Sequence, residues 1–572
     1  MDRSADDSDA FEEDSGSEWS MSDQESSDSS DFSETSDIES DDEGAQQDEN
    51  QVQPAVQPWL RVYPPETTDN TTHQFLEDAG PKHMPARDAT PLMYFLLFFT
   101  DGLLNLMVTE TNRYARQFRD ATQGTLKRFS RFHRWTDTTN IEMKAFIAIV
   151  INMGLNQRPL LQSYWSRKDS QHISWFPRVM SYNRFTLLLK CFSIMNRRNL
   201  VPNGQPGYDP TARFRPLVDH CNQLFKRFYT PKQDLSVDES LIGTKNKTEL
   251  LQYMPKKHHH KWGIKLWMLC ESATGYVLSF SVYRGRRGNV PEAGLSYQVV
   301  MDLMTMSNYL NKAYHVFCDN YFTGVELASD LFGLGTYLTG TLRRNRKHLP
   351  KGVKGKVDPG EVLYYRKDFL LTLGYKEKKS QKDSVLLLTT KYRADSERVR
   401  ARVRQRDVRA DDVQAGPGRV FRNKPAAIVG YNHFMGGVDQ SDMMLYAYLD
   451  ERRTLRFWKK VIFSLIGRFA VNAYILYLQN TSDRPKLTRY MFTVKIVEGL
   501  SNDFLDMKEA PLPDLNADKT AEIPDGKEKD CSVCSDRKRP GGRKRARTMC
   551  KNCQKGLCKP CVPRHKCKRL FK

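Results

Sequence analysis

The chain has 572 residues and a formal net charge of +19 at pH 7. This length exceeds what one hydrophobic core supports, so a single compact domain is excluded and several domains are expected. Residues 1–50 carry 20 acidic residues and one basic residue, which leaves the remainder with 87 basic and 49 acidic residues, a net charge of +38. This basic excess indicates a polyanionic partner, most simply nucleic acid, with a merely soluble basic protein as the alternative.

Residues 1–57 are rich in serine and acidic residues and poor in apolar ones, which predicts a disordered tail. Serines followed by acids, among them Ser33 and Ser36, suit an acid-directed kinase. The acidic start is unlike a secretory signal. No membrane partner is expected, because Arg468 and Asn472 interrupt the most apolar long stretch, Val461 to Leu478.

Residues 90–231 have helical periodicity. Glu142 to Leu155 is apolar nearly all round and predicts a buried helix. From Asp234 the pattern changes to strands, with DLSVDESLI, GIKLWMLCES, YVLSFSVYRG and HVFCDN as the clearest, and a helix follows from Val325 to Leu331. This mixture predicts an α/β domain.

Residues 346–425 suggest a small separate sheet from EVLYYRKD, FLLTLGYKE and DSVLLLTTKYR. Arginine then occupies every second position from Arg398 to Arg406. As a strand this run presents its guanidinium groups on one face, and as a loop it forms a flexible basic arm; the loop is favoured, and either can contact phosphates. Residues 447–508 return to helix.

Four aspartates stand out by their surroundings. Asp238 lies within one predicted strand and Asp319 ends another, while Asp439 and Asp442 follow two glycines at a spacing that shares one helix face. Convergent carboxylates repel one another, and Mg²⁺ relieves this repulsion and suits phosphate chemistry. From spacing alone, ordinary strand-end and helix-cap aspartates remain an alternative.

Seven of the eleven cysteines lie between Cys531 and Cys567. Their paired spacing is typical of two structural Zn²⁺ ions with interleaved, cross-brace ligands. The expected sets are Cys531, Cys534, Cys558 and Cys561 for one ion and Cys550, Cys553, His565 and Cys567 for the other. Residues 531–572 carry 15 basic residues and one acid, which favours DNA over a histone or ubiquitin-pathway partner. The run RKRPGGRKRAR also resembles a nuclear-localisation signal.

Several long motifs occur together in one order: EMKAFIAIVINMGL, RPLVDHCNQLFKRFYTP, YMPKKHHHKWGIKLWMLCESATGY, VFCDNYFTG, GTLRRNRKHLP and YNHFMGGVDQSDMM. They closely resemble the core motifs of piggyBac-family transposases, from about residue 90 to the C-terminus. The resemblance implies a ribonuclease-H-like catalytic core with an inserted domain, flanked by a mostly helical dimerisation and DNA-binding domain. It also implies a C-terminal cysteine-rich domain that recognises transposon ends.

The resemblance makes Asp238, Asp319 and Asp439 the metal-binding catalytic aspartates, with Asp442 as a fourth essential acid. It implies cut-and-paste transposition at TTAA targets through hairpin intermediates, with Mg²⁺ or Mn²⁺, by a nuclear homodimer or higher homo-oligomer on double-stranded DNA. A domesticated DNA-binding protein without transposition activity is the alternative.

Composition, pattern and resemblance together divide the chain. The expected segments are an acidic tail (1–57), a linker (58–89), the helical domain (90–233 and 447–508), the catalytic domain (234–345 and 426–446), an inserted domain (346–425), a second linker (509–530) and the cysteine-rich domain (531–572).

Basic residues close to these motifs are the expected DNA contacts. His258, His259 and His260 invite a metal interpretation, but neighbours in an extended chain point different ways, so a basic DNA-facing loop is favoured. For Trp458, helix packing is favoured over stacking on DNA. The predicted contacts are Lys256, Lys257, His258, His259, His260, Lys261, Arg343, Arg344, Arg346, Lys347, Trp458, Arg537, Lys538, Arg539, Arg543, Lys544, Arg545 and Arg547.

Overall fold

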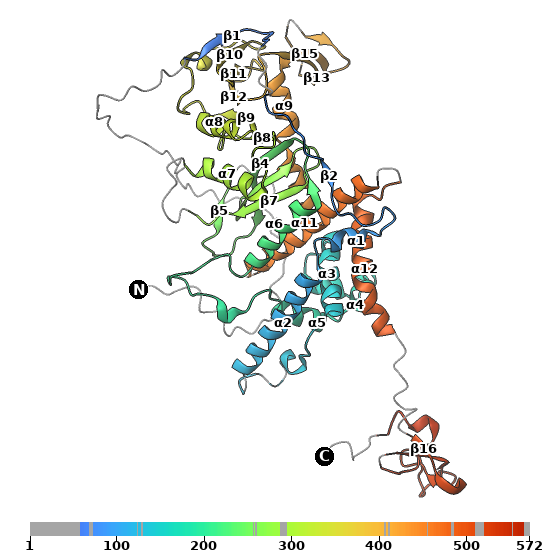
Figure 1. The fold of residues 1–572 in the computed structure, drawn as a ribbon. Helices are drawn as coiled ribbons and strands as arrows, with labels where there is room; N and C mark the ends of the chain where they lie inside the picture. The colour runs from blue at the N-terminus through green and yellow to red at the C-terminus, as the bar shows by residue number, and fades with distance from the viewer. Residues whose placement is uncertain are drawn as a thin grey trace. The chain divides into compact units, whose positions relative to one another are not determined.

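The computed structural model divides the chain into two compact units, Met1–Asn502 and Asp503–Lys572 (Figure 1). The residues that it describes are 58–67, 72–122, 124–126, 128, 130–255, 257, 260–285, 294–404, 408–409, 412–452, 454, 456–481, 485–509, 520–551 and 553–565. The predicted disordered tail, residues 1–57, lies outside this range.

Helices from both ends of unit 1 form its helical domain, and the last of them continues past the boundary at Asn502. They are α1 (Pro91–Leu96), α2 (Asp101–Ala121), α3 (Asn140–Leu155), α4 (Trp175–Val179), α5 (Tyr182–Cys191), α6 (Arg215–Phe228), α11 (Phe457–Asn480) and α12 (Arg489–Glu509). The hydroxyls of Thr100 and Thr139 cap α2 and α3 by accepting backbone N–H groups. The predicted buried helix is confirmed, since α3 is buried from Phe146 through Ile151.

Helix α11 is, among the described residues, long and apolar enough to cross a membrane. However, 78% of its most apolar window is buried inside the protein. The side chain of Asn472 exchanges hydrogen bonds of 3.0 Å with both backbone groups of Val277 on β7 (Val277–Val282). These contacts identify α11 as a core helix, and its polar residues are satisfied by the protein itself.

The central sheet carries the predicted strands. β4 (Asp234–Gly243), β6 (Trp262–Glu271) and β7 are antiparallel neighbours, and β8 (His315–Cys318) and β9 (Tyr337–Leu342) continue the sheet parallel to β4. The short β5 (Leu251–Tyr253) pairs with the start of β6. Helices α7 (Leu295–Ser307) and α8 (Val325–Gly333) connect the parallel part.

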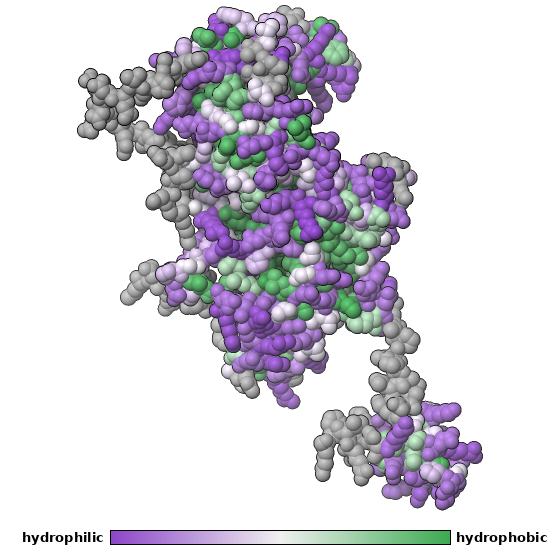
Figure 2. Space-filling model, in the orientation of Figure 1, coloured by the Kyte–Doolittle hydropathy of each residue, from purple (hydrophilic) through white to green (hydrophobic). Residues whose placement is uncertain are grey.

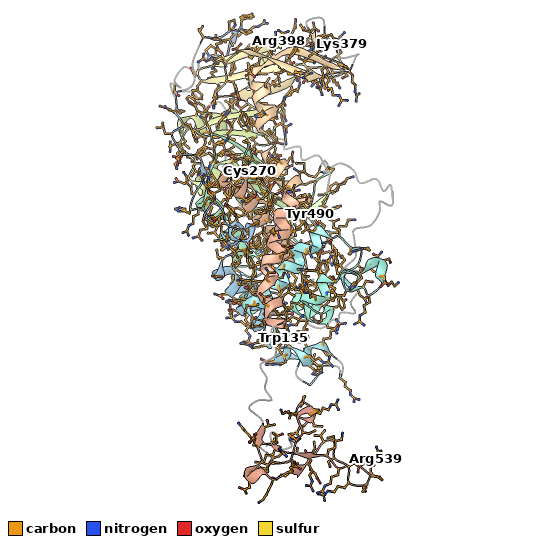
Figure 3. The ribbon with its side chains drawn as sticks, turned by 90° about the vertical axis from the view of Figure 1, so that its right-hand side faces the viewer. Trp135, Cys270, Lys379, Arg398, Tyr490 and Arg539 are labelled. Atoms are coloured by element: carbon orange, nitrogen blue, oxygen red, sulfur yellow. The ribbon has the colours of Figure 1, made fainter. Side chains whose placement is uncertain are left out.

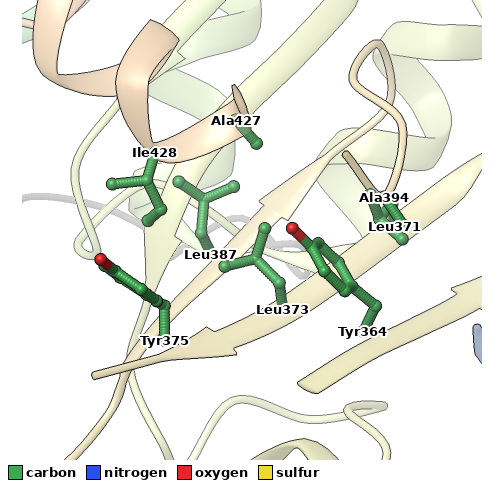
Figure 4. Packing of buried hydrophobic residues seen from close by; sticks show 8 residues of the cluster. All are labelled: Tyr364, Leu371, Leu373, Tyr375, Leu387, Ala394, Ala427 and Ile428. Atoms are coloured by element: carbon green, nitrogen blue, oxygen red, sulfur yellow. The ribbon is translucent and has the colours of Figure 1, made fainter. Parts of the chain in front are cut away.

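The predicted inserted strands exist, but they extend the central sheet instead of forming a separate one. β12 (Val385–Thr389) pairs with β9, and β11 (Leu370–Tyr375) and β10 (Val362–Lys367) follow in antiparallel order. Their buried face packs against α9 (Ala426–Phe434) around Leu373, Leu387 and Ile428 (Figure 4). The inserted strands β10, β11 and β12 are therefore part of the same sheet as β4 and β8.

The favoured loop for the arginine run is wrong over its first part. β13 (Ser396–Arg402) is a strand that pairs with β15 (Arg419–Pro425), which also pairs with β14 (Val413–Gln414). Arg398, Arg400 and Arg402 are exposed at alternate positions, and Figure 3 labels Arg398. Pairing with β15 supplies the hydrogen bonds that a loop lacks, while Arg406 lies outside the described residues.

Residues 58–89 are more than the expected linker. β1 (Leu60–Val62) adds an edge strand to β10, and Glu66 forms a bidentate ion pair with Arg366, 300 residues away. Both side chains of this pair are over nine-tenths buried. β2 (Gly80–Pro81) pairs with β3 (Tyr229–Thr230). The segment is thus held along the body of unit 1.

Candidate active site

Asp238, in the middle of β4, and Asp319, directly after β8, meet where the pairing of these two strands ends. β4 and β8 are parallel with Val237 opposite Cys318, so the next residue of each strand, Asp238 and Asp319, emerges at the same place. Asp319 is anchored by the N–H of Tyr321, which donates to Oδ1 at 2.9 Å. Burial, together with the charge of Glu239, raises the pKa of Asp238 well above its ordinary value. Two convergent carboxylates are therefore held where their negative charge is poorly solvated.

Glu239 completes this cluster and was missed by the sequence analysis. One carboxylate oxygen each from Asp238, Glu239 and Asp319 lies within 4.8 Å of the others. Neighbouring strand residues normally point to opposite faces, so periodicity argued against Glu239. The available signal was a second acid directly beside the strand aspartate.

Asp439 lies at the start of α10 (Gly437–Tyr446). The helix packs directly on β4 and β6: a Cβ on Gly437 would approach Ser236 Oγ to 2.4 Å. The Asp439 side chain is 72% exposed, and its Oδ1 lies 3.8 Å from Lys257 Nζ. The structure thus places Asp439 beside the three-carboxylate cluster with a lysine between them, and its convergence on one metal stays a prediction.

Two lysines occupy the acidic centre. Lys257 Nζ donates to the Glu239 carbonyl oxygen at 2.8 Å and lies 3.9 Å from its carboxylate. Burial lowers the pKa of Lys257, but the charges of Asp238, Glu239, Asp439 and Asp442 outweigh burial and raise the pKa above its ordinary value. Lys265 Nζ lies 3.7 Å from the centroid of the Trp267 ring, and burial lowers its pKa against the pull of the neighbouring carboxylates. Lys257, expected to contact DNA, thus faces the carboxylates.

Asp442 does not join the cluster. Its Oδ1 accepts hydrogen bonds from Arg468 Nη2 at 2.5 Å and from the Ser240 hydroxyl at 2.8 Å. Arg468 and Ser240 are both fully buried. The fourth acid predicted by the family resemblance is therefore an ion-paired residue directly behind the site.

The basic turn after β9 supports the loop that carries Asp319. Arg346 Nη2 donates to the carbonyl oxygens of Asn320, at 3.2 Å, and of Tyr321. Arg343 is exposed and lies 5.6 Å over the Tyr321 ring. Arg344 instead donates to Ser384 Oγ at 2.9 Å and joins the turn to the inserted strands. Among the four basic residues of this turn, only Arg343 and Lys347 are exposed and available for phosphate contact.

The histidine run and Trp458 have different outcomes. His258, His259 and Lys256 lie outside the described residues, while Lys261 is exposed. His260 is packed rather than free, because its Nε2 lies 2.5 Å from Glu451 Oε1. Trp458 is only 7% exposed and packs inside the helical domain, in agreement with the favoured interpretation, while its contact with DNA stays a prediction.

The carboxylate cluster fits a divalent cation. Burial raises the pKa of Asp319 as well as that of Asp238, and the charge of Glu239 adds to both effects. Oxygen ligands in this arrangement suit Mg²⁺ or Mn²⁺. A bound dication would stabilise the charged form of these buried carboxylates.

The C-terminal unit brings the predicted cysteine sets together. Cys531, Cys534, Cys558 and Cys561 form one group, and Cys550, Cys553 and His565 form the other, with ligand atoms in each within 4.8 Å. Both groups match the interleaved pairing, and thiolate and imidazole ligands fit tetrahedral zinc. Cys567 lies outside the described residues.

The expected linker 509–530 is shorter than predicted. β16 (Thr520–Glu522) pairs with β19 (Thr548–Cys550), and β17 (Lys529–Asp530) pairs with β18 (Arg545–Ala546). These pairings place residues 520–530 in the same folded region as the cysteine groups. Residues 511–519 lie outside the described part of the chain.

The basic loop of this module is organised by two acids that precede it. Asp530 accepts from Arg537 Nε at 2.7 Å and from Arg543 Nε at 3.0 Å, and Glu528 accepts from Arg547 at 3.2 Å. The loop also carries Lys538, Arg539, Lys544 and Arg545, of which Figure 3 labels Arg539. Hydrophilic side chains cover most of the visible module surface in Figure 2. The loop is therefore a partly ordered basic surface.

Comparison with known proteins settles the family. The family model described as "Transposase IS4" matches residues 90–474, which include all four aspartates. The chain belongs to the piggyBac-type transposases. The resemblance found in the sequence motifs is thereby confirmed.

Individual relatives are distant. The chain is 23% identical to human (Homo sapiens) piggyBac transposable element-derived protein 2 over 413 residues, which cover 69% of this chain and 62% of that protein. It is 25% identical to human piggyBac transposable element-derived protein 5 over 292 residues, 49% of this chain and 52% of that protein. The chain thus spans less than two thirds of the length of either relative.

A solved structure extends the comparison to the fold. The chain resembles a piggyBac transposase determined by cryo-electron microscopy in a synaptic complex with hairpin DNA, with a TM-score of 0.64. The match is 24% identical and covers 85% of this chain and 98% of that chain. The transposase fold is therefore shared.

Proposed function

We propose that the protein is a cut-and-paste DNA transposase that cleaves and joins phosphodiester bonds with Mg²⁺ or Mn²⁺. The observation that carries this proposal is the convergence of Asp238, Glu239 and Asp319 where the pairing of β4 with β8 ends, beside Asp439. Paired carboxylates of this kind hold the divalent ions used in phosphoryl transfer. Family membership supports the same chemistry.

Each residue of the site has a definable task. Bound divalent ions would activate the attacking oxygen and stabilise the departing one. Asp238 and Asp319 supply the central ligands, and Glu239 adds a carboxylate beside them. Asp439 becomes a ligand on the exposed side when the Lys257 side chain moves out from between Asp439 and the cluster. Arg346 holds the Asp319 loop by its backbone, and Arg343 and Lys347 orient phosphates at the rim.

The sheet supports a ribonuclease-H-like assignment of the core. Its order, β7, β6, β4, β8 and β9, has three antiparallel strands followed by two parallel ones, with the first carboxylate on the central strand β4. The strands from β10 to β15 form the insertion between Asp319 and Asp439. This arrangement brings distant acids to one edge.

The wider transposase reaction is part of the same proposal. Hairpin intermediates, TTAA targets and an oligomeric complex on double-stranded DNA are inferred from family membership, and hairpin DNA is named for the solved relative. The cysteine-rich unit would hold two structural Zn²⁺ ions and recognise the transposon end. A nuclear location follows from the DNA substrate and from the basic run at Arg537 to Arg547.

A domesticated DNA-binding protein is the second candidate, favoured by the human relatives described as transposable element-derived. The test mixes the full chain with a library of duplex DNA fragments that includes the DNA on both sides of its gene, in Mg²⁺ or Mn²⁺. Denaturing gels should show nicked strands and hairpin ends. Specific binding with no cleavage in either metal would favour the second candidate and overturn the enzyme proposal.

A further inference from the structure

Arg468 on α11 lies directly behind the catalytic carboxylates and is fully buried. We propose that Arg468 is a positioning residue of the catalytic centre, which ties α10 to β4 and thereby fixes Asp439 relative to Asp238. The inference rests on the proposed function of this site. It also gives Asp442 a role other than metal coordination.

The guanidinium connects three elements. Nη2 donates to Asp442 Oδ1 at 2.5 Å and to Ser240 Oγ at 2.8 Å, while Nη1 donates to Ser441 Oγ at 3.0 Å. The Ser240 hydroxyl donates in turn to Asp442 Oδ1 at 2.8 Å. One buried side chain of α11 thus holds two consecutive residues of α10 and one residue of β4.

The spacing along each element relates this network to the catalytic acids. Asp442 lies three residues after Asp439 on α10, and residues three apart lie on neighbouring positions of one helix face. Ser240 lies two residues after Asp238 on β4, so both side chains project from the same strand face. A shift of the Asp442–Ser240 contact would therefore move Asp439 relative to Asp238.

Close contacts along the first half of α10 add to this constraint. A Cβ on Gly275 would lie 3.1 Å from both Gly437 O and Ser441 N, and a Cβ on Gly437 would meet Ser236 Oγ at 2.4 Å. Helix α10 is thus packed closely on β4 and on the turn between β6 and β7. The polar network behind it sets the remaining degrees of freedom, its rotation and its slide.

Electrostatics favour a role for this network in positioning α10 over a role in stabilising the fold. A buried ion pair contributes little stability compared with well-packed apolar residues of the same volume. Arg468 Nε has no hydrogen-bond partner among the described residues, so the guanidinium is incompletely satisfied. Asp442 Oδ1, which accepts two hydrogen bonds, is already engaged, and Asp442 is not part of the carboxylate cluster of Asp238, Glu239 and Asp319.

The test compares Arg468→Met with Arg422→Met as a matched control. Arg422 is equally buried, and its Nη2 lies 2.5 Å from Asp412 Oδ2, but it belongs to the β13–β15 sheet. For each full-length variant, the cleavage kcat, the KM for DNA, the melting temperature and the Mn²⁺ affinity by electron paramagnetic resonance are measured.

Arg468→Met should lower kcat by about 100-fold, the loss expected for a displacement of about 1 Å. It should also weaken Mn²⁺ binding and leave the KM for DNA unchanged. Arg468→Lys should recover part of kcat, because an ammonium also pairs with Asp442. Arg422→Met should lower the melting temperature without changing kcat or Mn²⁺ affinity.

Unchanged kcat and Mn²⁺ affinity in Arg468→Met would overturn the proposal. The proposal would also be overturned if Arg468→Met and Arg422→Met lowered the melting temperature equally and Arg468→Met lost no more kcat than Arg422→Met. If Arg468→Met does not fold, Ser240→Ala, which removes one link, takes its place under the same criteria. If the unmodified chain binds Mn²⁺ but does not cleave DNA, the proposed function fails, whereas the Mn²⁺ comparison still decides the positioning role.

Discussion

The cysteine-rich unit should lose its structure when either zinc site is broken. The variants Cys531→Ser and Cys550→Ser each remove one ligand from a different group. Because the unit is short, its metal ligands rather than its core should determine whether it folds.

The structure gives the size of this effect. Apart from cysteines, the buried apolar side chains of residues 520–551 and 553–565 are Ile523, Ala546 and Leu557. Complete burial of one Ile or Leu side chain contributes about 1.5–3 kcal/mol. Binding of one structural zinc contributes about 10–16 kcal/mol in zinc-finger peptides. Metal binding is thus the larger contribution by several-fold.

Limited trypsin digestion of the full-length protein provides the assay, since the loop from Arg537 to Arg547 is rich in cleavage sites. The basic side chains of this loop are exposed, but the folded backbone restrains it. Chelation, or either Cys→Ser variant, should release the backbone, speed cleavage of the loop and abolish discrimination between transposon-end and random DNA. Ser532→Ala, beside a ligand, is the matched control and should behave like the unmodified chain. An unchanged rate of cleavage in the loop after measured release of two zinc equivalents would refute the reasoning.

Three further predictions concern unit 1 and the tail. Arg366→Met leaves Glu66 buried without its ion pair, so it should cost about 3–5 kcal/mol and speed hydrogen exchange over residues 58–67; unaltered exchange would show that the pair does not hold this segment. Replacing Arg398, Arg400 and Arg402 together with alanine should weaken the salt dependence of DNA binding. The slope of log affinity against log salt concentration should fall by about 0.9 for each phosphate that the variant no longer neutralises, and an unchanged slope would exclude β13 from the DNA-binding surface. Deleting residues 1–57, which carry a large acidic excess, should raise DNA affinity most at low ionic strength, and equal affinities there would leave only a solubilising tail.

Local periodicity predicted much of the secondary structure. The apolar run at Glu142–Leu155 and the strands that contain Asp238 and precede Asp319 appear where the sequence places them. The motifs also identified the family. These predictions succeeded because the apolar periodicity that indicates a helix or a strand depends on residues that are close together in the sequence.

The misses arise from contacts between distant segments. The pairing of Glu66 with Arg366 and the burial of Arg468 against Asp442 depend on tertiary packing that no local pattern encodes. For the arginine run, alternation did indicate a strand, but its partner β15 could not be identified from that pattern. For Trp458, the favoured helix packing agrees with its burial, and a contact with DNA was added to the predictions only through the family resemblance.

The central claim is that Asp238 and Asp319 perform metal-dependent DNA cleavage. The most direct measurement is strand cleavage by Asp319→Asn, beside DNA binding by the same protein, with Asp302→Asn as the control because Asp302 is an exposed acid on α7. Asp319→Asn should bind DNA like the unmodified chain and yield no nicked or hairpin product in Mg²⁺ or Mn²⁺, while Asp302→Asn cleaves normally. Cleavage by Asp319→Asn at the unmodified rate would contradict the account.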